Sequence, residues 1–195
     1  MSSELKDYCK IIEKHLDRDT CEKVIEEIES GLEWQQNEFY DNRTEKSFAP
    51  SEDDEECEMK CDTTIPTHPF LMEKIKDAFY DYVIHHNFPS VNGWAGYSPP
   101  RFNKYSENQK MCVHADHINS LFDGERKGIP MFTGMTVLND DFKGGEFVMF
   151  PDSKNEFRPT LETGDFMVFP SNFLYPHLVA PVKEKVRYSF SSWVW

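Results

Sequence analysis

Apolar residues recur at two different spacings along the chain. Up to about residue 95 they recur at three- and four-residue intervals in two stretches, which is the period of a helix with one buried face. The first stretch predicts a helix that starts at an N-capping aspartate, Asp19, and ends at Gly31. The second predicts a helix that starts at Thr67 and ends near His86.

The segments beside these helices have less regular patterns. Tyr8–Leu16 fits a strand or a helix, and the aromatic residues of Leu32–Tyr40 predict a strand. Asp41–Pro66 differs in kind, because nine of its residues are acidic and its apolar residues are sparse. We expect this segment to be a loop or to be disordered.

From Gly96 onward, short apolar runs alternate with turn residues, which is typical of antiparallel sheets. Glycine-containing breaks at residues 143–145 and 163–164 separate neighbouring runs and predict hairpin turns. The predicted strands are Arg101–Tyr105, Lys110–His117, Phe132–Asn139, Glu146–Phe150, Phe157–Glu162, Asp165–Pro170, Pro176–Pro181 and Arg187–Val194.

The order of these elements predicts the fold class. Eight short strands that follow two helices fit a mainly β (α+β) protein with a double-stranded β-helix, or jelly roll, buttressed by two or three N-terminal helices. With 195 residues the chain has the length of a single domain. We expect a helical support at about residues 1–95, which includes the acidic segment 41–66, and a jelly-roll core at about residues 96–195.

The net charge limits the classes of binding partner, and the cysteine content indicates the cellular compartment. A net charge of −14 argues against a nucleic-acid partner, because phosphate binding depends on clustered Lys and Arg. The chain has no apolar run of membrane-spanning length, and its N-terminus is charged, unlike a signal peptide. Five irregularly spaced cysteines suit reduced thiols in a cytoplasm. Cys57 and Cys61 have the spacing of half a zinc site, but the sequence has no partner pair.

Four residues have the pattern of a mononuclear iron site. His114 and Asp116 are two residues apart in a predicted strand, so their side chains are expected to point to the same side. By the same alternation, His117 is expected to point away. His177, on a later strand, would add a second imidazole, and two imidazoles with one carboxylate on one face of Fe(II) leave positions open for reactants. Arg187 would provide a fixed positive charge that binds a carboxylate through paired hydrogen bonds.

Around these residues the sequence resembles the 2-oxoglutarate- and Fe(II)-dependent dioxygenases, most closely the prolyl 4-hydroxylase-like branch found in bacteria, phages and eukaryotes. The resemblance runs from about Arg101 to Trp195 and implies a double-stranded β-helix core. The motifs that carry it are, in order, Arg101-Phe102-Asn103-Lys104-Tyr105, His114-x-Asp116, Val137-Leu138-Asn139, Gly144-Gly145-Glu146-x-x-x-Phe150, Gly164-Asp165-x-x-x-Phe169, Pro176-His177-x-Val179-x-Pro181-Val182 and Arg187-Tyr188-x-x-x-x-Trp193.

The resemblance implies a reaction and its cofactors. 2-Oxoglutarate would be decarboxylated to succinate with O2 while a substrate C–H bond is hydroxylated, with ascorbate as reductant. The expected Fe(II) ligands are His114, Asp116 and His177, and the residues expected to bind or line the 2-oxoglutarate site are Arg187, Tyr105, Thr133, Ser191 and Trp193. The substrate favoured by the resemblance is a prolyl residue in a protein or peptide. A free amino acid or another small molecule is an alternative substrate, and a non-catalytic module that binds metal or ligand is an alternative function.

The chain departs from the family pattern at three positions. Asn108 and Lys185 stand where the family usually has turn glycines, and Asn adopts a left-handed conformation more readily than Lys. Val137 stands where the family often has a tyrosine that helps to hold 2-oxoglutarate. We therefore expect fewer hydrogen bonds to the far carboxylate of this cosubstrate, or bonds from other residues.

Overall fold

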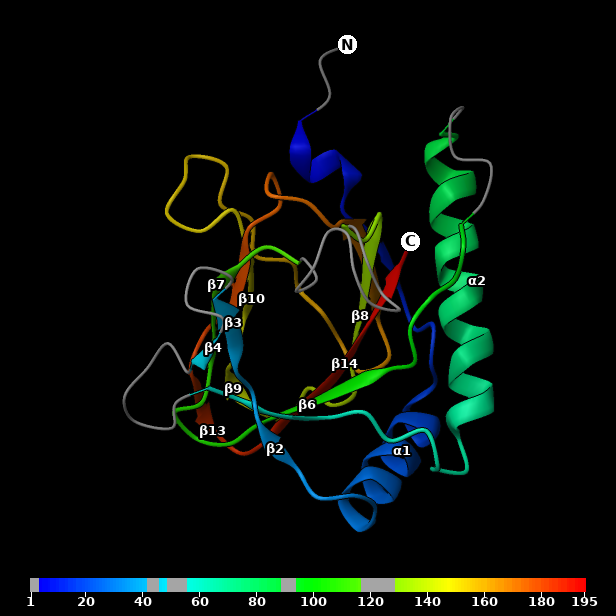
Figure 1. Ribbon diagram of the computed structural model, residues 1–195, viewed down its shortest axis with the longest axis vertical. Coiled ribbons are helices and arrows are strands. Elements are labelled where there is room, and N and C mark those ends of the chain that lie inside the picture. Colours follow the sequence, from blue (N-terminus) through cyan, green and yellow to red (C-terminus); the bar gives the residue numbers. More distant parts are fainter. Residues whose placement is uncertain (1–3, 42–45, 49–55, 89–93, 117–128) are drawn as a thin grey trace.

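The computed structural model describes residues 4–41, 46–48, 56–88, 94–116 and 129–195. Its main feature is a seven-stranded antiparallel sheet faced by smaller sheets (Figure 1). No helix in the described part of the chain has the length and apolar content needed to cross a membrane.

The large sheet combines strands from both parts of the chain. Its order is β1 (Lys10–Ile12), β11 (Phe166–Pro170), β8 (Phe132–Val137), β14 (Arg187–Val194), β6 (Arg101–Tyr105), β5 (Glu58–Lys60) and β2 (Gln35–Gln36). Every neighbouring pair in it is antiparallel. The outer strands β1, β5 and β2 come from the part of the chain that we expected to be helical support.

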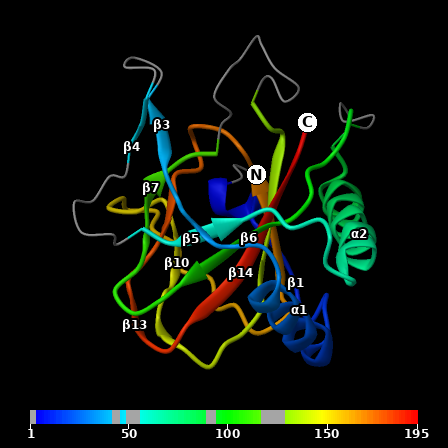
Figure 2. The same ribbon diagram turned by 60° about the horizontal axis from the view of Figure 1, so that its bottom comes forward.

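Three smaller sheets complete the β structure. The first has the order β10 (Phe147–Met149), β12 (His177–Val179) and β7 (Met111–His114). The others are two-stranded and pair β13 (Val182–Glu184) with β9 (Lys143–Gly144), and β3 (Phe39–Asp41) with β4 (Lys46–Phe48). In both ribbon views β7 and β10 lie across from the large sheet, on the side away from the helix α2 (Figures 1 and 2).

Two helices, α1 (Arg18–Ser30) and α2 (His68–His86), cover the outer face of the large sheet, and a short 3-10 helix (Leu5–Tyr8) precedes β1. The core between helices and sheet is apolar and largely aromatic. Close packing at its centre depends on Gly134 of β8, where an added Cβ would lie 2.5 Å from Cε1 of Phe166 and 3.0 Å from Cζ of Phe79. The fold class is therefore the predicted one: a jelly roll with helices on one sheet.

The sheet's inner face encloses a second core together with β7, β10 and β12. Strand alternation separates the two faces cleanly. On β8, Met135 and Val137 belong to the inner core, whereas Phe132 belongs to the outer one. The residues of the candidate site line a cavity together with Met135, Phe147 and Phe169 of this inner core.

Several element boundaries differ from the prediction. The helix α1 is capped by Asp17 and not by Asp19, because the Asp17 carboxylate accepts a hydrogen bond of 2.7 Å from the backbone N–H of Thr20. Asp19 lies in the first turn, where a negative charge is favourable next to the helix dipole. Gly31 ends this helix and Thr67 precedes α2, as predicted.

The acidic segment 41–66 contains more structure than we predicted, although residues 42–45 and 49–55 lie outside the described part. It includes β4 and β5, and β5 pairs with β6 in the large sheet. Lys60 at the end of β5 is buried and donates hydrogen bonds to the carbonyl oxygens of Ile28 and Leu32 at the end of α1. A positive charge at the C-terminal end of a helix interacts favourably with the helix dipole. The contact joins segments far apart in the chain, so no periodic pattern in the sequence predicts it.

One predicted strand, Phe157–Glu162, does not form; only Phe157 makes an isolated bridge, to Met149. The predicted break at residues 143–145 is partly a strand, because β9 pairs with β13. The predicted strand Leu32–Tyr40 is reduced to β2 and to part of β3. Asn108 and Lys185 both have positive φ, of 70° and 63°, so the turns keep the glycine-like conformation without glycine.

Candidate active site

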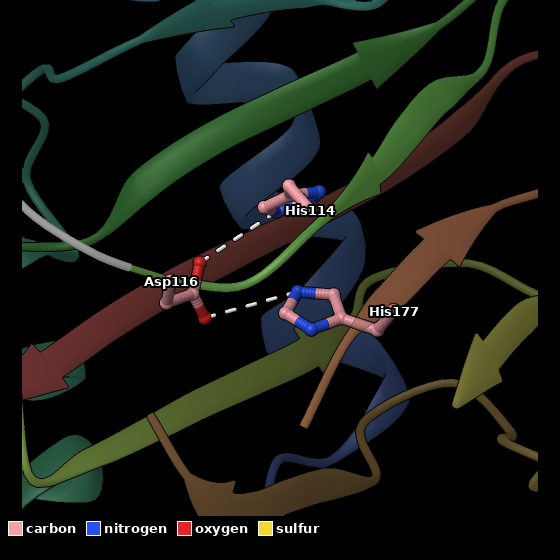
Figure 3. Close-up of side chains that lie close together, drawn as sticks. All are labelled: His114, Asp116 and His177. Atoms are coloured by element: carbon pink, nitrogen blue, oxygen red, sulfur yellow. Dashed lines mark ion pairs between the residues drawn. The ribbon is translucent and has the colours of Figure 1, made fainter. Parts of the chain in front are cut away.

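The two histidines of the predicted metal site are direct neighbours in the small sheet. His114 ends β7, His177 begins β12, and the two residues are partners in register, with ring centroids 4.3 Å apart. Asp116 lies close to both: one carboxylate oxygen is 3.6 Å from Nε2 of His114 and the other is 3.8 Å from Nε2 of His177 (Figure 3). One ligand atom from each of the three residues lies within 4.8 Å of the others.

The position of Asp116 does not result from the predicted alternation along a strand. Strand β7 ends at His114, so Asp116 lies two residues beyond it, in irregular backbone. Its carboxylate is instead directed by Thr133 on β8, whose hydroxyl donates a hydrogen bond of 2.6 Å to Oδ2. His117, which we expected to point away, lies outside the described residues.

Backbone carbonyl groups orient both imidazoles. Nδ1 of His114 lies 2.8 Å from the carbonyl oxygen of Cys112, and Nδ1 of His177 lies 3.0 Å from that of Tyr175. A carbonyl oxygen only accepts hydrogen bonds, so each Nδ1 carries the proton and each Nε2 keeps a lone pair. Burial lowers the pKa of His177 to about 4, which favours the neutral ring that a metal needs.

Asp116 is held as a carboxylate although it is buried. Burial by itself would raise its pKa, but electrostatic interactions with the neighbouring His177 and His114 and the hydrogen bond from the Thr133 hydroxyl outweigh this effect and lower the pKa. The hydroxyl of Thr133, which donates to Asp116, also lies 2.5 Å from the hydroxyl of Ser171. Ser171 is buried and follows β11, and nothing in its sequence context had marked it as part of the site.

Arg187 lies at the other end of the same inner face. It begins β14 directly opposite Tyr105 of β6, and its guanidinium lies 4.9 Å from the Tyr105 ring centroid. The side chain is 1% exposed, and Nη1 donates a hydrogen bond of 2.9 Å to the hydroxyl of Ser189. Its Nε–H has no hydrogen-bond partner, and no carboxylate among the described residues forms an ion pair with it. Burial lowers its pKa, but a guanidinium stays charged.

A cavity connects the two ends. It is lined by all three predicted metal ligands and by all five residues expected at the 2-oxoglutarate site: Arg187, Tyr105, Thr133, Ser191 and Trp193. Arg187, Ser189, Ser191 and Trp193 alternate along β14, as the period of a strand requires. Further lining residues that our sequence analysis gave no role are Arg101, Asn103, Met111, Met135, Phe147, Phe169 and Val179.

Two of these additional residues have a clear function in packing. The guanidinium of Arg101 stacks on Trp193 at 4.9 Å from the ring centroid, which fixes the position of this tryptophan in the cavity wall. The ring of Phe147 lies 5.2 Å from that of His177. Arg101 begins one of the family motifs, so its place on β6 was a signal that could have identified it.

The donor set fits Fe(II). It offers two neutral imidazole nitrogens and one carboxylate, brought to one side of a shared space, with the remaining sides open to the cavity. Among the described residues, no other group of His, Cys, Asp or Glu is arranged to hold a metal, and this includes Cys57 and Cys61.

The comparisons with known proteins agree with this site. A family model described as the 2OG-Fe(II) oxygenase superfamily matches residues 100–195, so this part of the chain is similar to that superfamily. Among similar proteins are PKHD-type hydroxylases. One from Stenotrophomonas maltophilia is 34% identical over 100 residues, which are 50% of this chain and 43% of that protein. One from Xylella fastidiosa is 32% identical over 110 residues, covering 49% and 44%. The chain thus spans less than half the length of these relatives.

Solved structures share the fold over nearly the whole chain. A viral collagen prolyl hydroxylase from Paramecium Bursaria Chlorella virus-1 has a TM-score of 0.65 at 17% identity and covers 96% of this chain and 94% of that one. A Pseudomonas putida prolyl-4-hydroxylase has the same TM-score and identity, covering 96% and 91%. A Trichoplax adhaerens prolyl hydroxylase, solved with a hypoxia inducible factor peptide, has a TM-score of 0.69 at 15% identity, covering 96% and 83%.

Proposed function

We propose that this protein is an Fe(II)- and 2-oxoglutarate-dependent dioxygenase that hydroxylates a C–H bond of a prolyl residue in a protein or peptide. The observation that carries the proposal is the geometry of one cavity. Two imidazole Nε2 atoms and a carboxylate converge at one end, and a buried guanidinium without a carboxylate partner lies at the other. The chemical groups at the two ends suit a metal at one end and a carboxylate at the other.

Each residue has a distinct part in this proposal. His114, Asp116 and His177 hold Fe(II), while the backbone carbonyls behind the histidines and the hydroxyl of Thr133 keep the three side chains in place. Arg187 binds the C5 carboxylate of 2-oxoglutarate through charge-assisted hydrogen bonds. The residues expected to complete the wall of the cosubstrate site are Tyr105, Thr133, Ser191 and Trp193.

When bound, iron and 2-oxoglutarate would supply the oxidising chemistry, in which 2-oxoglutarate loses CO2, one atom of O2 enters the resulting succinate and the other enters the substrate C–H bond. The protein orients these groups and excludes water from them. Phe147, Phe169 and Met135 form an apolar wall that serves the second purpose. Ascorbate would keep the iron reduced between turnovers.

Several features support a protein or peptide substrate. Three of the solved structures that share this fold are named prolyl hydroxylases, and one of them was solved with a peptide. The net charge of −14 favours a basic peptide over an acidic one and disfavours nucleic acid. Five cysteines, odd in number and irregularly spaced, accord with a reducing, cytoplasmic setting. We further propose that residues 1–195 act as a single catalytic domain.

The decisive experiment is anaerobic titration of the Fe(II)-loaded protein with 2-oxoglutarate. We expect a metal-to-ligand charge-transfer absorption band. Folded, metal-loaded protein without this band would be a non-catalytic metal-binding module and would overturn the proposal. A screen of proline-containing peptides and free amino acids under O2, analysed by mass spectrometry for the gain of one oxygen atom, then tests the substrate class. Turnover of free amino acids with all peptides unchanged would identify a small-molecule hydroxylase instead.

A further inference from the structure

A second cavity is lined by Arg187 but by none of the three candidate metal ligands. It has a volume of about 320 Å³, enough for a small organic group. One wall is the segment 158–161, which forms no strand and therefore leaves a space between itself and the sheets. Other walls are Val137 at the end of β8 and Phe142.

This second cavity adjoins the first one, because Arg187 and Phe147 line both. The two differ strongly in size: the cavity beside the metal-binding residues has a volume of about 30 Å³. Binding of a dicarboxylate therefore requires the inner wall to move, and the unbranched side chain of Met135 is well suited to this. Most of the space next to Arg187 therefore belongs to the cavity that the candidate metal ligands do not line.

The lining of the second cavity suits an apolar chain that ends in a carboxylate. Val137, Phe142 and Leu161 provide apolar surface, and the charged lining residues are one carboxylate, Glu146, and two arginines, Arg158 and Arg187. Arg187 provides a buried positive charge with an unpaired Nε–H, and Arg158 lies at the rim, where it also pairs with Glu156 at 2.9 Å. An uncompensated buried cation is costly, so an anion that reaches it is strongly favoured.

We propose that this cavity extends the cosubstrate site, so that the protein binds 2-oxo dicarboxylates longer than 2-oxoglutarate. The inference rests on the proposed function. Val137 determines this property, because its short side chain faces the cavity from β8 and a larger one would fill the space beside Arg187. The 2-oxo acid end would remain at the metal-binding residues, while the additional methylene groups and the distal carboxylate would occupy the second cavity.

The test compares 2-oxoglutarate with 2-oxoadipate, which is one methylene longer, in anaerobic titrations of the Fe(II)-loaded protein. The charge-transfer band reports binding, and calorimetry with Mn(II) in place of iron gives a second readout. We expect the Kd of 2-oxoadipate to lie within about tenfold of that of 2-oxoglutarate. The variant Val137→Phe should raise the Kd of 2-oxoadipate at least about tenfold more than that of 2-oxoglutarate.

A second variant, Thr160→Trp, fills the same cavity from its exposed side and should also raise the Kd of 2-oxoadipate more than that of 2-oxoglutarate. This variant provides the test if Val137→Phe does not fold. Ile84→Trp on the exposed surface of α2 is the matched control and should change neither constant. The inference is overturned, with the proposed function intact, if wild-type protein binds 2-oxoglutarate but 2-oxoadipate is more than about 100-fold weaker. An unchanged ratio of the two constants in the variants overturns it as well. No band with 2-oxoglutarate itself would overturn both proposals.

Discussion

The two faces of the large sheet are built from the same strands but have opposite character. On the outer face, side chains such as Phe102, Phe166 and Phe190 pack against one another with ring centroids 6.0 to 6.1 Å apart, beneath α1 and α2. On the inner face, alternate residues of the same strands are polar and buried, among them Arg187 and Ser189 of β14 and Thr133 of β8.

Neighbouring residues of one strand therefore have different roles: those on the outer face stabilise the fold, and those on the inner face form the candidate site. Buried polar groups cost free energy unless they are paired, so the inner face is expected to contribute less to stability than the outer one. The apolar outer face offsets this cost and holds the strands in the register that brings the candidate site together. Substitutions on the outer face should therefore change mainly the free energy of unfolding, and substitutions on the inner face should change mainly metal and ligand binding.

The largest effect is expected at the metal ligands of the inner face. His177→Ala or Asp116→Ala should abolish Fe(II) binding, because each removes a ligand from a set of three, while the fold is retained. Fe(II) binding by equilibrium dialysis and circular dichroism would measure the two properties. His85→Ala, on the exposed side of α2, is the control and should bind iron normally. Normal iron binding by either ligand variant would refute the assignment.

On the outer face we expect the reverse. Phe166→Ala removes a buried ring that contacts both Phe79 and Phe190, and it should lower the free energy of unfolding by about 3–5 kcal/mol. Urea unfolding would measure the loss. At low urea the remaining folded protein should bind Fe(II) with nearly unchanged affinity. A loss of iron affinity as large as the loss of stability would mean that the two faces are not separable.

Arg187→Met should weaken 2-oxoglutarate binding about 10- to 150-fold, the effect expected for the loss of charge-assisted hydrogen bonds. Iron affinity should remain nearly intact, because the guanidinium is not one of the three ligands. Since the variant also removes a buried charge without a carboxylate partner, the free energy of unfolding without ligand should not fall. Arg18→Met, at an exposed ion pair with Asp140, is the control for loss of an arginine.

Thr133→Val keeps the shape of the side chain but removes the hydrogen bond to Asp116. We expect iron affinity to fall about 10- to 100-fold, as for other groups that orient metal ligands. Ser171→Ala should have a smaller effect, because Ser171 contacts Asp116 only through Thr133. The effects should not add in the double variant, and full additivity in metal titrations would exclude a connected pair of hydroxyls.

The smallest effect concerns the helix that covers the outer face. Asp17→Ala should lower the free energy of unfolding by about 1 kcal/mol through loss of the N-cap, without any change in ligand binding. The neighbouring Asp19→Ala is a matched control with the same change in charge and should cost less. Urea unfolding of both variants would decide between the cap in the structure and the cap predicted from the sequence.

Much of the site could be predicted because the residues concerned lie on strands whose alternation the sequence displays. Arg187, Ser191 and Trp193 share a face of β14, as alternation along a strand predicts. Tyr105, which was expected from the family resemblance, meets Arg187 in register. Asp116 lies beside His114 and His177 as expected, but strand alternation does not place it there, because β7 ends before it. Its position depends on Thr133, which is 17 residues away in the sequence.

The sequence by itself determined the class of fold, the candidate metal ligands and the basic residue opposite them, because these follow from periodicity and from the order of a few chemically distinctive side chains. Only the tertiary structure decided that β5 joins the large sheet, that Ser171 supports the site and that segment 158–161 forms no strand. Each of these depends on contacts between segments far apart in the chain. Such contacts are formed by packing and by backbone hydrogen bonds, which impose no local pattern on the sequence.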